Sequence, residues 1–185
     1  MPGDLHTPRL HLRSLSHADE RLYCSLYTDA DVMRHVAEPL TPEAARRAFQ
    51  AVLRQLAAAP PQSRYWILAP RTGGNDLGLM AWVSDRDDAG SAEVGVLLAG
   101  STECRGYATE SIAALADAVF AETAQQRLWT RHARDNAAAI GLMRKLGFEP
   151  LEEARADPAP VRWHLERQAW TARQAPVFAS PGANC

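Results

Sequence analysis

The sequence predicts a single α/β (α+β) domain built on a mixed sheet, and three observations support this. A length of 185 residues with 46% hydrophobic content suits one sizeable core rather than two. Strand-like alternation and the 3.6-residue period of helices succeed one another along the chain. The expected order is strand, two helices, three strands, helix, strand, helix and two strands, without repeats or an interdomain linker, and this order is typical of layered folds.

The first strand is expected over Arg9–Leu15, where Leu10 and Leu12 alternate with polar residues. Ser16 is a typical helix N-cap, with Asp19 at the third position of the helix that follows. The N-terminal segment is therefore predicted as a half-buried strand that leads directly into a helix.

A second helix and a hairpin are expected next. Thr41-Pro42 combines an N-cap with proline at the first helical position, and Pro60-Pro61 is expected to end this helix. Tyr65–Ala69 and Leu77–Val83 are predicted strands, joined by a Gly-Gly-Asn-Asp turn.

The C-terminal half alternates strands and helices. The single domain is expected to span residues 1–170, and residues 171–185, rich in Ala, Pro, Ser and Gly, are expected to form a flexible tail. The predicted elements are a strand over Glu93–Leu98, a helix from Gly106 to about Glu122, a strand over Arg127–His132, a helix over Asn136–Leu146, and strands over Phe148–Glu153 and Val161–Ala169.

Composition and charge narrow the classes of function. With 20 basic and 22 acidic residues the net charge is -2, so no basic excess favours nucleic acid or an anionic membrane as a partner. Cys24, Cys104 and Cys185 are far apart and odd in number, so neither a zinc site nor a disulfide framework is expected. No signal-peptide pattern and no run of about 18 apolar residues is found. These features predict a cytoplasmic protein without a metal ion.

The segment from Cys104 to Glu110 follows a strand and a short loop and opens a helix. The first turn of a helix presents backbone N–H groups without internal acceptors, which suit a pyrophosphate. Gly106 and Ala108 leave room for phosphate oxygens to approach the backbone, and Arg105 adds a positive charge. The segment matches neither a P-loop nor a dinucleotide-binding fingerprint, and most segments of this kind, taken alone, are tight loops.

The run from Ala92 to Glu110 resembles the acetyl-CoA-binding motif of the GNAT superfamily of N-acetyltransferases, and the RimJ/RimL type is the subgroup that it resembles most. The resemblance implies a mixed, mostly antiparallel central sheet of about seven strands with a splayed parallel pair, flanked by about four helices. It covers roughly Leu5 to Leu165 and includes Thr7-Pro8-Arg9-Leu10 to Arg13, Asp31–Val36, Asn136–Ile140 and Lys145–Phe148.

The resemblance also implies acetyl-CoA, or another acyl-CoA, as co-substrate. Asn136 would hydrogen-bond the pantetheine, although it also suits a helix cap. Met143 and Lys145 would line the far side of the cofactor, with core packing an equal alternative for Met143. Backbone groups of Val96, Leu97 and Leu98 would face the pantetheine, and Cys104, Arg105, Gly106, Tyr107, Ala108 and Thr109 would hold the pyrophosphate.

The implied reaction transfers an acetyl or other short acyl group to a primary amine of a protein N-terminus or a small molecule. Glu93 is the candidate general base, because the superfamily often has a carboxylate at this strand position, and a solvated strand end is its plain alternative. His35 and Glu38 lie in the segment that usually covers the acceptor pocket, so they are candidates for substrate binding and substitutes as base.

Some positions depart from the family pattern. The family pattern has other residues at the positions of Glu103 and Cys104, and it usually has glycine at the position of Cys104. The tyrosine acid of many relatives is absent at Met143, and the serine of RimL-like ones is absent at Ala139. A non-catalytic acyl-CoA-binding or sensor module is therefore the alternative, and an unrelated α/β domain is a third reading. Dimers are common in the subgroup, so a homodimer is consistent with the resemblance.

Overall fold

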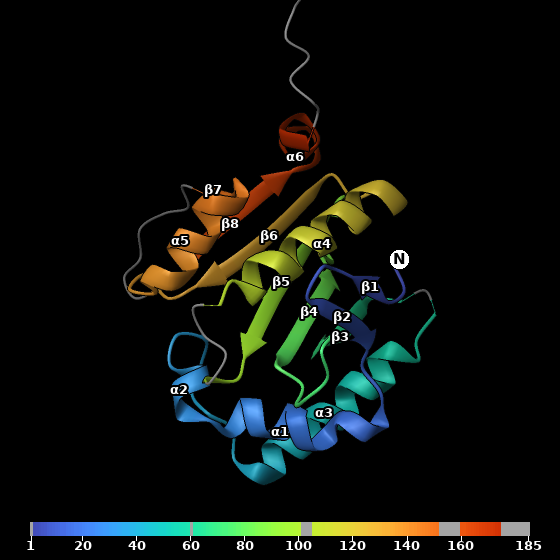
Figure 1. The fold of residues 1–185 in the computed structure, drawn as a ribbon, viewed down its shortest axis with the longest axis vertical. Coiled ribbons are helices and arrows are strands. Elements are labelled where there is room, and N and C mark those ends of the chain that lie inside the picture. The colour runs from blue at the N-terminus through green and yellow to red at the C-terminus, as the bar shows by residue number, and fades with distance from the viewer. Residues whose placement is uncertain (1, 60, 101–104, 152–159, 175–185) are drawn as a thin grey trace, which may run out of the picture.

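The computed structural model describes residues 2–59, 61–100, 105–151 and 160–174, and its elements follow one another as drawn in Figure 1. A single 3-10 turn, η1, covers His17–Asp19. The helices are α1 Glu20–Thr28, α2 Ala30–Met33, α3 Pro42–Leu56, α4 Tyr107–Glu122, α5 Ala137–Leu146 and α6 Arg167–Gln174. The strands are β1 Leu5–His6, β2 Leu10–Ser14, β3 Ser63–Pro70, β4 Gly78–Ser84, β5 Ser91–Leu98, β6 Arg127–His132, β7 Glu149–Pro150 and β8 Val161–Glu166.

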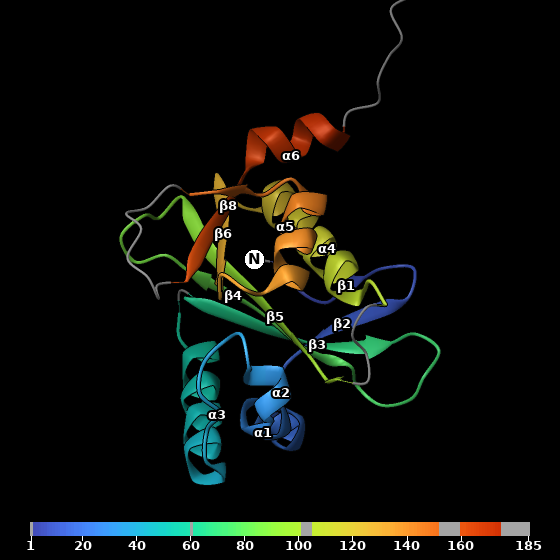
Figure 2. The ribbon, with the colours of Figure 1, turned by 90° about the vertical axis from the view of Figure 1, so that its left-hand side faces the viewer.

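One sheet of eight strands, in the order β1-β2-β3-β4-β5-β6-β8-β7, lies between two layers of helices. Figure 2 shows α1, α2 and α3 on one face and α4 and α5 on the other. Apolar side chains alternate between the faces: Leu68 packs in the cluster that includes α4 and α5, and Ile67 in the cluster that includes α1 and α3. The predicted α/β fold with a mixed, mostly antiparallel sheet is confirmed.

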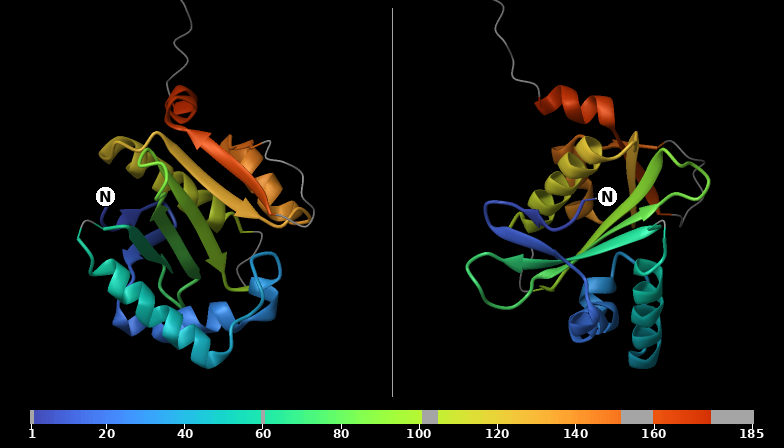
Figure 3. Two further views of the ribbon diagram at one scale, coloured as in Figure 1. Left: turned by 180° about the vertical axis from the view of Figure 1, so that it is seen from behind. Right: turned by 90° about the vertical axis from the view of Figure 1, so that its right-hand side faces the viewer.

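The parallel pair β5–β6 is short and then splays. Its register joins Ser91 with Arg127 and ends where Glu93 lies beside Trp129. Beyond this point β5 continues to Leu98 while β6 turns away, and the two arrows diverge in Figure 1 and in the left panel of Figure 3. The sheet therefore opens along the last five residues of β5, as the resemblance implied.

Local sequence signals explain how the N-terminal helices begin. Ser16 accepts a hydrogen bond from the Ala18 N–H and forms a capping box with Asp19, although the first turn is a 3-10 turn rather than α-helix. Thr41 accepts from the Ala44 N–H, and Pro42 occupies the first helical position. The helix α3 ends at Leu56, before the Pro60-Pro61 pair that was expected to end it.

The Asp19 carboxylate is buried and accepts two hydrogen bonds from the Arg13 guanidinium, at 3.0 and 2.7 Å. Burial opposes its ionisation, but Arg13 and the Ser16 N–H outweigh that and hold the pKa of Asp19 below its usual value of 3.8. A lowered carboxyl pKa adds stability above the usual value, and that stability is lost as the pH falls through the folded-state pKa.

We therefore expect Asp19→Asn to lower the free energy of unfolding by about 2 kcal/mol at pH 7, because the buried side chain loses its charge and the half-buried Arg13 guanidinium keeps only Asp76 as an ion-pair partner. The difference between the two proteins should shrink as the pH falls below about 4. Urea unfolding at neutral and acidic pH measures both. A difference that stays constant over this range would contradict the assigned role of the carboxylate.

The end of the chain differs from the prediction. The last strand ends at Glu166 rather than at Ala169, and Arg167–Gln174 forms α6, so residues 171–174 of the expected tail are helical. The predicted strand Phe148–Glu153 is only Glu149–Pro150 among the described residues. The elements β1, α2 and α6 were not predicted, so the described part of the chain has eight strands and six α-helices in place of about seven and four. Among the residues described, no helix combines the length and apolar character that crossing a membrane requires.

Contacts with the C-terminal ends of α4 and α5 explain why α6 forms. Arg167 donates to one carbonyl oxygen in the last turn of α4 and to two that follow the helix, and Trp170 Nε1 donates to Asp117 at 2.8 Å. Arg173 donates to the Lys145 carbonyl at 2.9 Å, at the end of α5. Because carbonyl groups at helix C-termini lack internal donors, these two arginines satisfy groups that would otherwise be unpaired.

Candidate functional site

The helix α4 begins with a glycine that has a positive φ. Gly106 is the N-cap at φ 77°, a conformation that glycine adopts without steric cost, and it supplies no capping side chain. The first amide with a helical acceptor is that of Glu110, which donates to the Gly106 carbonyl at 3.0 Å. The preceding amides, Tyr107, Ala108 and Thr109, have no acceptor among the described residues. Such a row of amide donors at a helix start suits an anionic group.

Arg9, the residue immediately before β2, contacts this turn from outside the predicted motif. Its Nε donates to Glu110 Oε2 at 2.6 Å, and its Nη1 donates to the Arg105 carbonyl at 2.9 Å. The guanidinium also lies over the Tyr107 ring, 4.6 Å from its centroid. A Cβ atom added to Gly106 would come within 3.5 Å of Nη2 of Arg9. No local sequence pattern predicts this contact, because 101 residues separate Arg9 from Glu110.

Glu110 is ionised and engaged in the same cluster. Burial opposes its ionisation, but hydrogen bonds from Thr7 and from the Arg9 backbone and side chain hold the pKa of the carboxyl below its usual value. Thr7 Oγ1 donates to Glu110 Oε1 at 2.5 Å and the Arg9 N–H donates to the same oxygen at 3.0 Å. Arg9 therefore offsets a negative charge in the first turn of the helix.

We expect Arg9→Ala to raise the dissociation constant for coenzyme A about fivefold to tenfold. The turn would lose the hydrogen bond that Arg9 donates to the Arg105 carbonyl, and Glu110 would lose its positively charged partner. Isothermal titration calorimetry measures this. Arg71→Ala is the matched control, since Arg71 donates to the Thr7 carbonyl but makes no contact with the turn. Equal affinities of wild type and Arg9→Ala would contradict the assigned role.

Backbone groups of β5 face the opening between β5 and β6. The Asp85 N–H donates to the Ser91 carbonyl and the Ala99 N–H to the Leu77 carbonyl, and the β4–β5 register between them is continuous. Since the direction of backbone groups alternates along a strand, Leu97 bonds to β4, whereas Val96 and Leu98 present their N–H and C=O groups on the other side. There β6 no longer pairs with β5. Of the three predicted pantetheine contacts, two face the opening.

Asn136, at the start of α5, is a helix cap. Its Oδ1 accepts from the Ala139 N–H at 2.9 Å, and its side-chain amide NH2 has no acceptor among the residues described. Met143 lies farther along the helix, buried at 3% exposure within the core. Lys145 is exposed in the last turn, about 14 Å of helix from Asn136. The structure therefore does not bring Asn136 and Lys145 together.

The predicted acceptor segment reaches the end of β6. The His35 carbonyl accepts from the Ala133 N–H at 3.3 Å, and His35 Nδ1 lies 3.3 Å from Asp135 Oδ1. This places His35 beside the connection that leads to Asn136. Glu38 is exposed and has no hydrogen-bond or ion-pair partner in the described part of the chain.

Glu93 lies where the two parallel strands separate, as the last residue of β5 that pairs with β6. Its side chain is on the face that carries α1 and α3, and its Oε1 lies 3.1 Å from Arg131 Nε. Tyr65, on β3, points to the same face. Burial, Tyr27 and Glu93 together raise the pKa of the Tyr65 hydroxyl to about 12, so it remains protonated near Glu93 at neutral pH.

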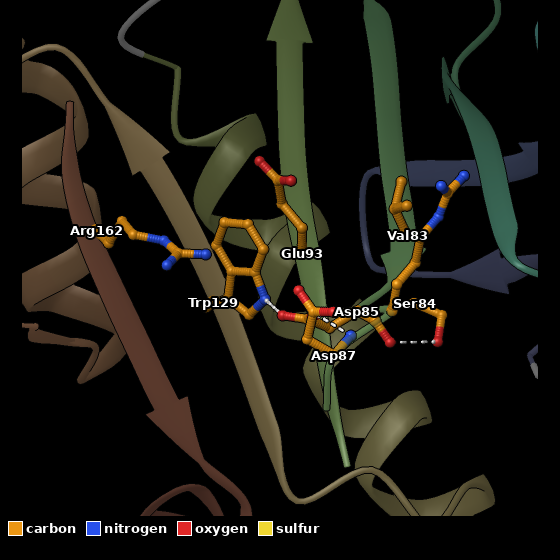
Figure 4. Close-up of a pocket in the computed structure, with 8 residues that line it drawn as sticks. Val83, Ser84, Asp85, Asp87, Glu93, Trp129 and Arg162 are labelled. Atoms are coloured by element: carbon orange, nitrogen blue, oxygen red, sulfur yellow. Dashed lines mark hydrogen bonds between the residues drawn. The ribbon is translucent and has the colours of Figure 1, made fainter. Parts of the chain in front are cut away.

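A cavity of about 460 Å³ adjoins Glu93 (Figure 4). Trp129 of β6 forms part of its wall, and the indole Nε1 donates to Asp85 Oδ2 at 3.1 Å. The guanidinium of Arg162 lies over the indole, 4.1 Å from the ring centroid. The cavity is lined by Val83, Ser84, Asp85, Arg86, Asp87, Glu93, Trp129 and Arg162. Trp82 and Trp163 are buried in the core, whereas Trp129 is buried but also lines this cavity.

The predicted residues thus form two connected groups in the structure. The helix start at Gly106 and the free edge of β5 lie at the open end of the splay, and Glu93 lies at its closed end. Cys104 lies outside the described residues. Arg9, Tyr65 and Trp129 are the site neighbours that the sequence did not identify. Among the described residues, no group of three or more His, Cys, Asp or Glu side chains is arranged to hold a metal ion.

Comparison with protein families gives one match. Residues 9–149 match the model of the acetyltransferase (GNAT) domain, which is most of the chain. A search of curated protein sequences finds no match.

Several solved structures share the fold. A spermidine N-acetyltransferase from Vibrio cholerae, in complex with CoA and spermine, has a TM-score of 0.74 at 18% identity, covering 89% of this chain and 99% of that one. An acetyltransferase from Agrobacterium tumefaciens has a TM-score of 0.75 at 22% identity, covering 90% and 95%. The aminoglycoside acetyltransferase AAC(6')-Ib, in complex with coenzyme A, has a TM-score of 0.73 at 17% identity, covering 89% and 98%.

Proposed function

The chain belongs to the GNAT acetyltransferase family, and from this premise we propose that it transfers an acetyl or other short acyl group from acyl-CoA to a primary amine. The observation that carries the proposal is the start of α4. Three consecutive amides without acceptors among the described residues follow a glycine with positive φ, beside a strand whose backbone groups face an open gap. An acyl-CoA has a diphosphate and a pantetheine arm, and these two features suit the two parts of that arrangement.

The binding mode follows from this arrangement. The diphosphate accepts hydrogen bonds from the amides of Tyr107, Ala108 and Thr109, and Arg9 holds the turn in place. The pantetheine amides pair with the backbone of Val96 and Leu98, and the Asn136 side-chain NH2 donates to the same arm. The thioester then lies toward the closed end of the splay, near Glu93.

Glu93 acts as the general base. It accepts a proton from the attacking ammonium, directly or through water, and leaves a neutral amine. The amine nitrogen attacks the thioester carbonyl, a C–N bond forms, the C–S bond breaks, and coenzyme A leaves as a thiolate that takes up a proton. A main-chain N–H near Leu98 stabilises the oxyanion that forms on the carbonyl.

No strong acid is needed for the departure of coenzyme A. The position of the usual tyrosine acid is Met143, which is buried in the core, and Ala139 replaces the serine of RimL-like relatives. An ordinary thiol has a pKa near 8.5, so the thiolate leaves without obligatory protonation. The protonated Tyr65 hydroxyl near Glu93 is a further donor on the acceptor side.

The acceptor belongs on the open face beside Glu93, where the 460 Å³ cavity offers space for a small molecule or an extended N-terminus. Two of the solved structures with this fold act on small amines, as their names state, and this supports a small-molecule acceptor. The RimJ/RimL-like motifs support a protein N-terminus as the other acceptor class. Since acyl-CoA is an intracellular metabolite, the cytoplasm is the proposed compartment.

A thiol-release assay with acetyl-CoA and a panel of amines tests this proposal against the alternative of a non-catalytic acyl-CoA-binding module. We expect release above background with at least one primary amine. If coenzyme A binds but no amine in the panel causes release, the binding module is the better assignment. If coenzyme A does not bind, both assignments fail.

A further inference from the structure

Gly95 lies in the interior of β5, between Val94 and Val96. Glycine weakens a strand, so it is expected there for a left-handed backbone, a bulge or the close approach of another group. Gly95 does not have a positive φ. The register between β4 and β5 passes without interruption through the pair Ala81–Gly95, so the strand has no bulge there. The first two reasons for glycine are therefore absent.

No part of the described chain approaches Gly95 either. A Cβ atom added to it would meet no atom within 4 Å outside the adjacent residues. Gly95 is exposed, whereas Glu93 and Leu97, its neighbours on the same face of the strand, are half-buried. The remaining reason for glycine is a ligand that passes close above the backbone at this position.

Gly95 is placed next to the proposed reaction. It lies two residues beyond Glu93, on the face that carries α1 and α3 (Figure 2), and just past the end of the pairing with β6. Its N–H and C=O groups pair with Ala81, so only the space above Gly95 is available to a ligand. The cavity assigned to the acceptor is lined by residues of the β4–β5 connection, before the start of β5, and Gly95 is not among its lining residues. The acceptor and the ligand above Gly95 therefore reach Glu93 from opposite sides.

The surroundings of this space are apolar. Ala81, the partner of Gly95 on β4, has only a methyl group, and Tyr65 is the next residue across the sheet, on β3. Leu79 and Leu97 form the next pair along the same face, and they belong to one apolar cluster with Tyr65. A hydrocarbon chain suits these neighbours, because contact with them removes its surface from water.

The spacing of the strands sets the length of that chain. Neighbouring strands lie about 4.8 Å apart, so a chain that passes from above Gly95 to above Ala81 spans about 5 Å. With carbon–carbon bonds of about 1.5 Å, an extended acyl group of about four carbon atoms covers this distance. The methyl group of an acetyl would cover only its first part, and the half-buried Tyr65 lies beyond it.

We propose that Gly95 determines the acyl specificity of the transfer. The space above Gly95 and Ala81 takes the hydrocarbon part of the acyl group, so that butyryl-CoA is a better donor than acetyl-CoA. This inference rests on the proposed function, because it assigns the place of the acyl group in the same site.

Isothermal titration calorimetry with free CoA, acetyl-CoA and butyryl-CoA tests the inference without an acceptor. We expect the dissociation constant for butyryl-CoA to be about fivefold lower than that for acetyl-CoA, because two more methylene groups are partly removed from water. Thiol release with any amine that supports it should give kcat/KM values in the same order.

Gly95→Val fills the space above the strand. The ratio of the dissociation constants for acetyl-CoA and butyryl-CoA should fall from about five to about one. Ala81→Leu should lower the same ratio, because it fills the far part of the space. Valine suits a strand better than glycine does, so the melting temperature of Gly95→Val should not fall below that of the wild type. A lower melting temperature would show that the fold itself requires this glycine and would contradict the inference.

Gly3→Val is the matched control. Gly3 also has no atom within 4 Å of an added Cβ and no positive φ, and it precedes β1, the strand at the far edge of the sheet. The same exchange at this position should leave the ratio at about five.

Equal affinities of the wild type for acetyl-CoA and butyryl-CoA would overturn the inference but not the proposed function. So would a preference for butyryl-CoA that persists in Gly95→Val. A Gly95→Val variant that raises the KM for the amine at an unchanged acyl ratio would assign the space to the acceptor instead and overturn the inference. Failure of free CoA to bind, or absence of thiol release with every amine, would contradict the proposed function; in the second case the calorimetric ratio still decides the inference.

Discussion

Glu93→Gln is expected to lower kcat about 10² to 10³-fold while the dissociation constant for coenzyme A stays within a factor of two. Glutamine keeps the shape of the side chain at the closed end of the splay but cannot accept a proton. The thioester carbonyl and the amine would still be brought together, so binding survives and only proton removal fails. Thiol release at saturating amine, combined with calorimetry, separates the two effects.

The ion pair between Glu93 and Arg131 supplies the control for this experiment. Arg131→Gln removes the partner of Glu93 at 3.1 Å but leaves the carboxylate in place, so its effect on kcat should be less than tenfold. A Glu93→Gln enzyme with nearly full activity would contradict the assignment. Loss of activity in His35→Gln instead would place the base in the loop after α2.

Arg167→Ala is expected to lower the free energy of unfolding by about 3 kcal/mol, which corresponds to a fall in melting temperature of roughly 8 °C for a domain of this size. Arg167 donates to the carbonyl oxygens of Phe120, Thr123 and Gln125, and its guanidinium carbon lies 5.4 Å from the centroid of the Phe120 ring. Truncation leaves these acceptors without donors and releases α6 from the end of α4. Urea unfolding followed by circular dichroism measures the loss.

Two further variants show whether the planar guanidinium of Arg167 is responsible for the stabilisation. Arg167→Lys keeps the charge but not the planar set of donors, so it should recover less than half of the loss. Gln168→Ala changes the exposed neighbouring residue and should stay within about 0.5 kcal/mol of wild type. A wild-type melting temperature for Arg167→Ala would show that α6 does not depend on this contact.

The parts of the fold that the sequence predicted are those with local signals. The strand Arg127–His132 has the predicted bounds, and the helix from Tyr107 to Glu122 follows the predicted glycine. The helix start at Gly106 depends only on this residue and its neighbours in the chain, so a local sequence pattern was sufficient to predict it. The same holds for the Asn136 cap, whose partner lies three residues away.

The missed features depend on contacts between distant residues. Helix α6 is rich in polar residues and forms against Asp117 and the ends of two other helices, which no local pattern shows. Trp129 lines a cavity because Asp85, 44 residues earlier, accepts a hydrogen bond from its indole. Trp129 lies in the predicted strand Arg127–His132 and is buried, but the cavity wall that it forms depends on the tertiary arrangement.

The central claim is that unpaired amides at the start of α4 bind the diphosphate of acyl-CoA. Titration of isotope-labelled protein with coenzyme A, followed by amide chemical shifts, tests it most directly. We predict the largest shifts at Tyr107, Ala108 and Thr109, and none there when pantetheine without the diphosphate is added. Coenzyme A binding that leaves these three amides unmoved would contradict the account.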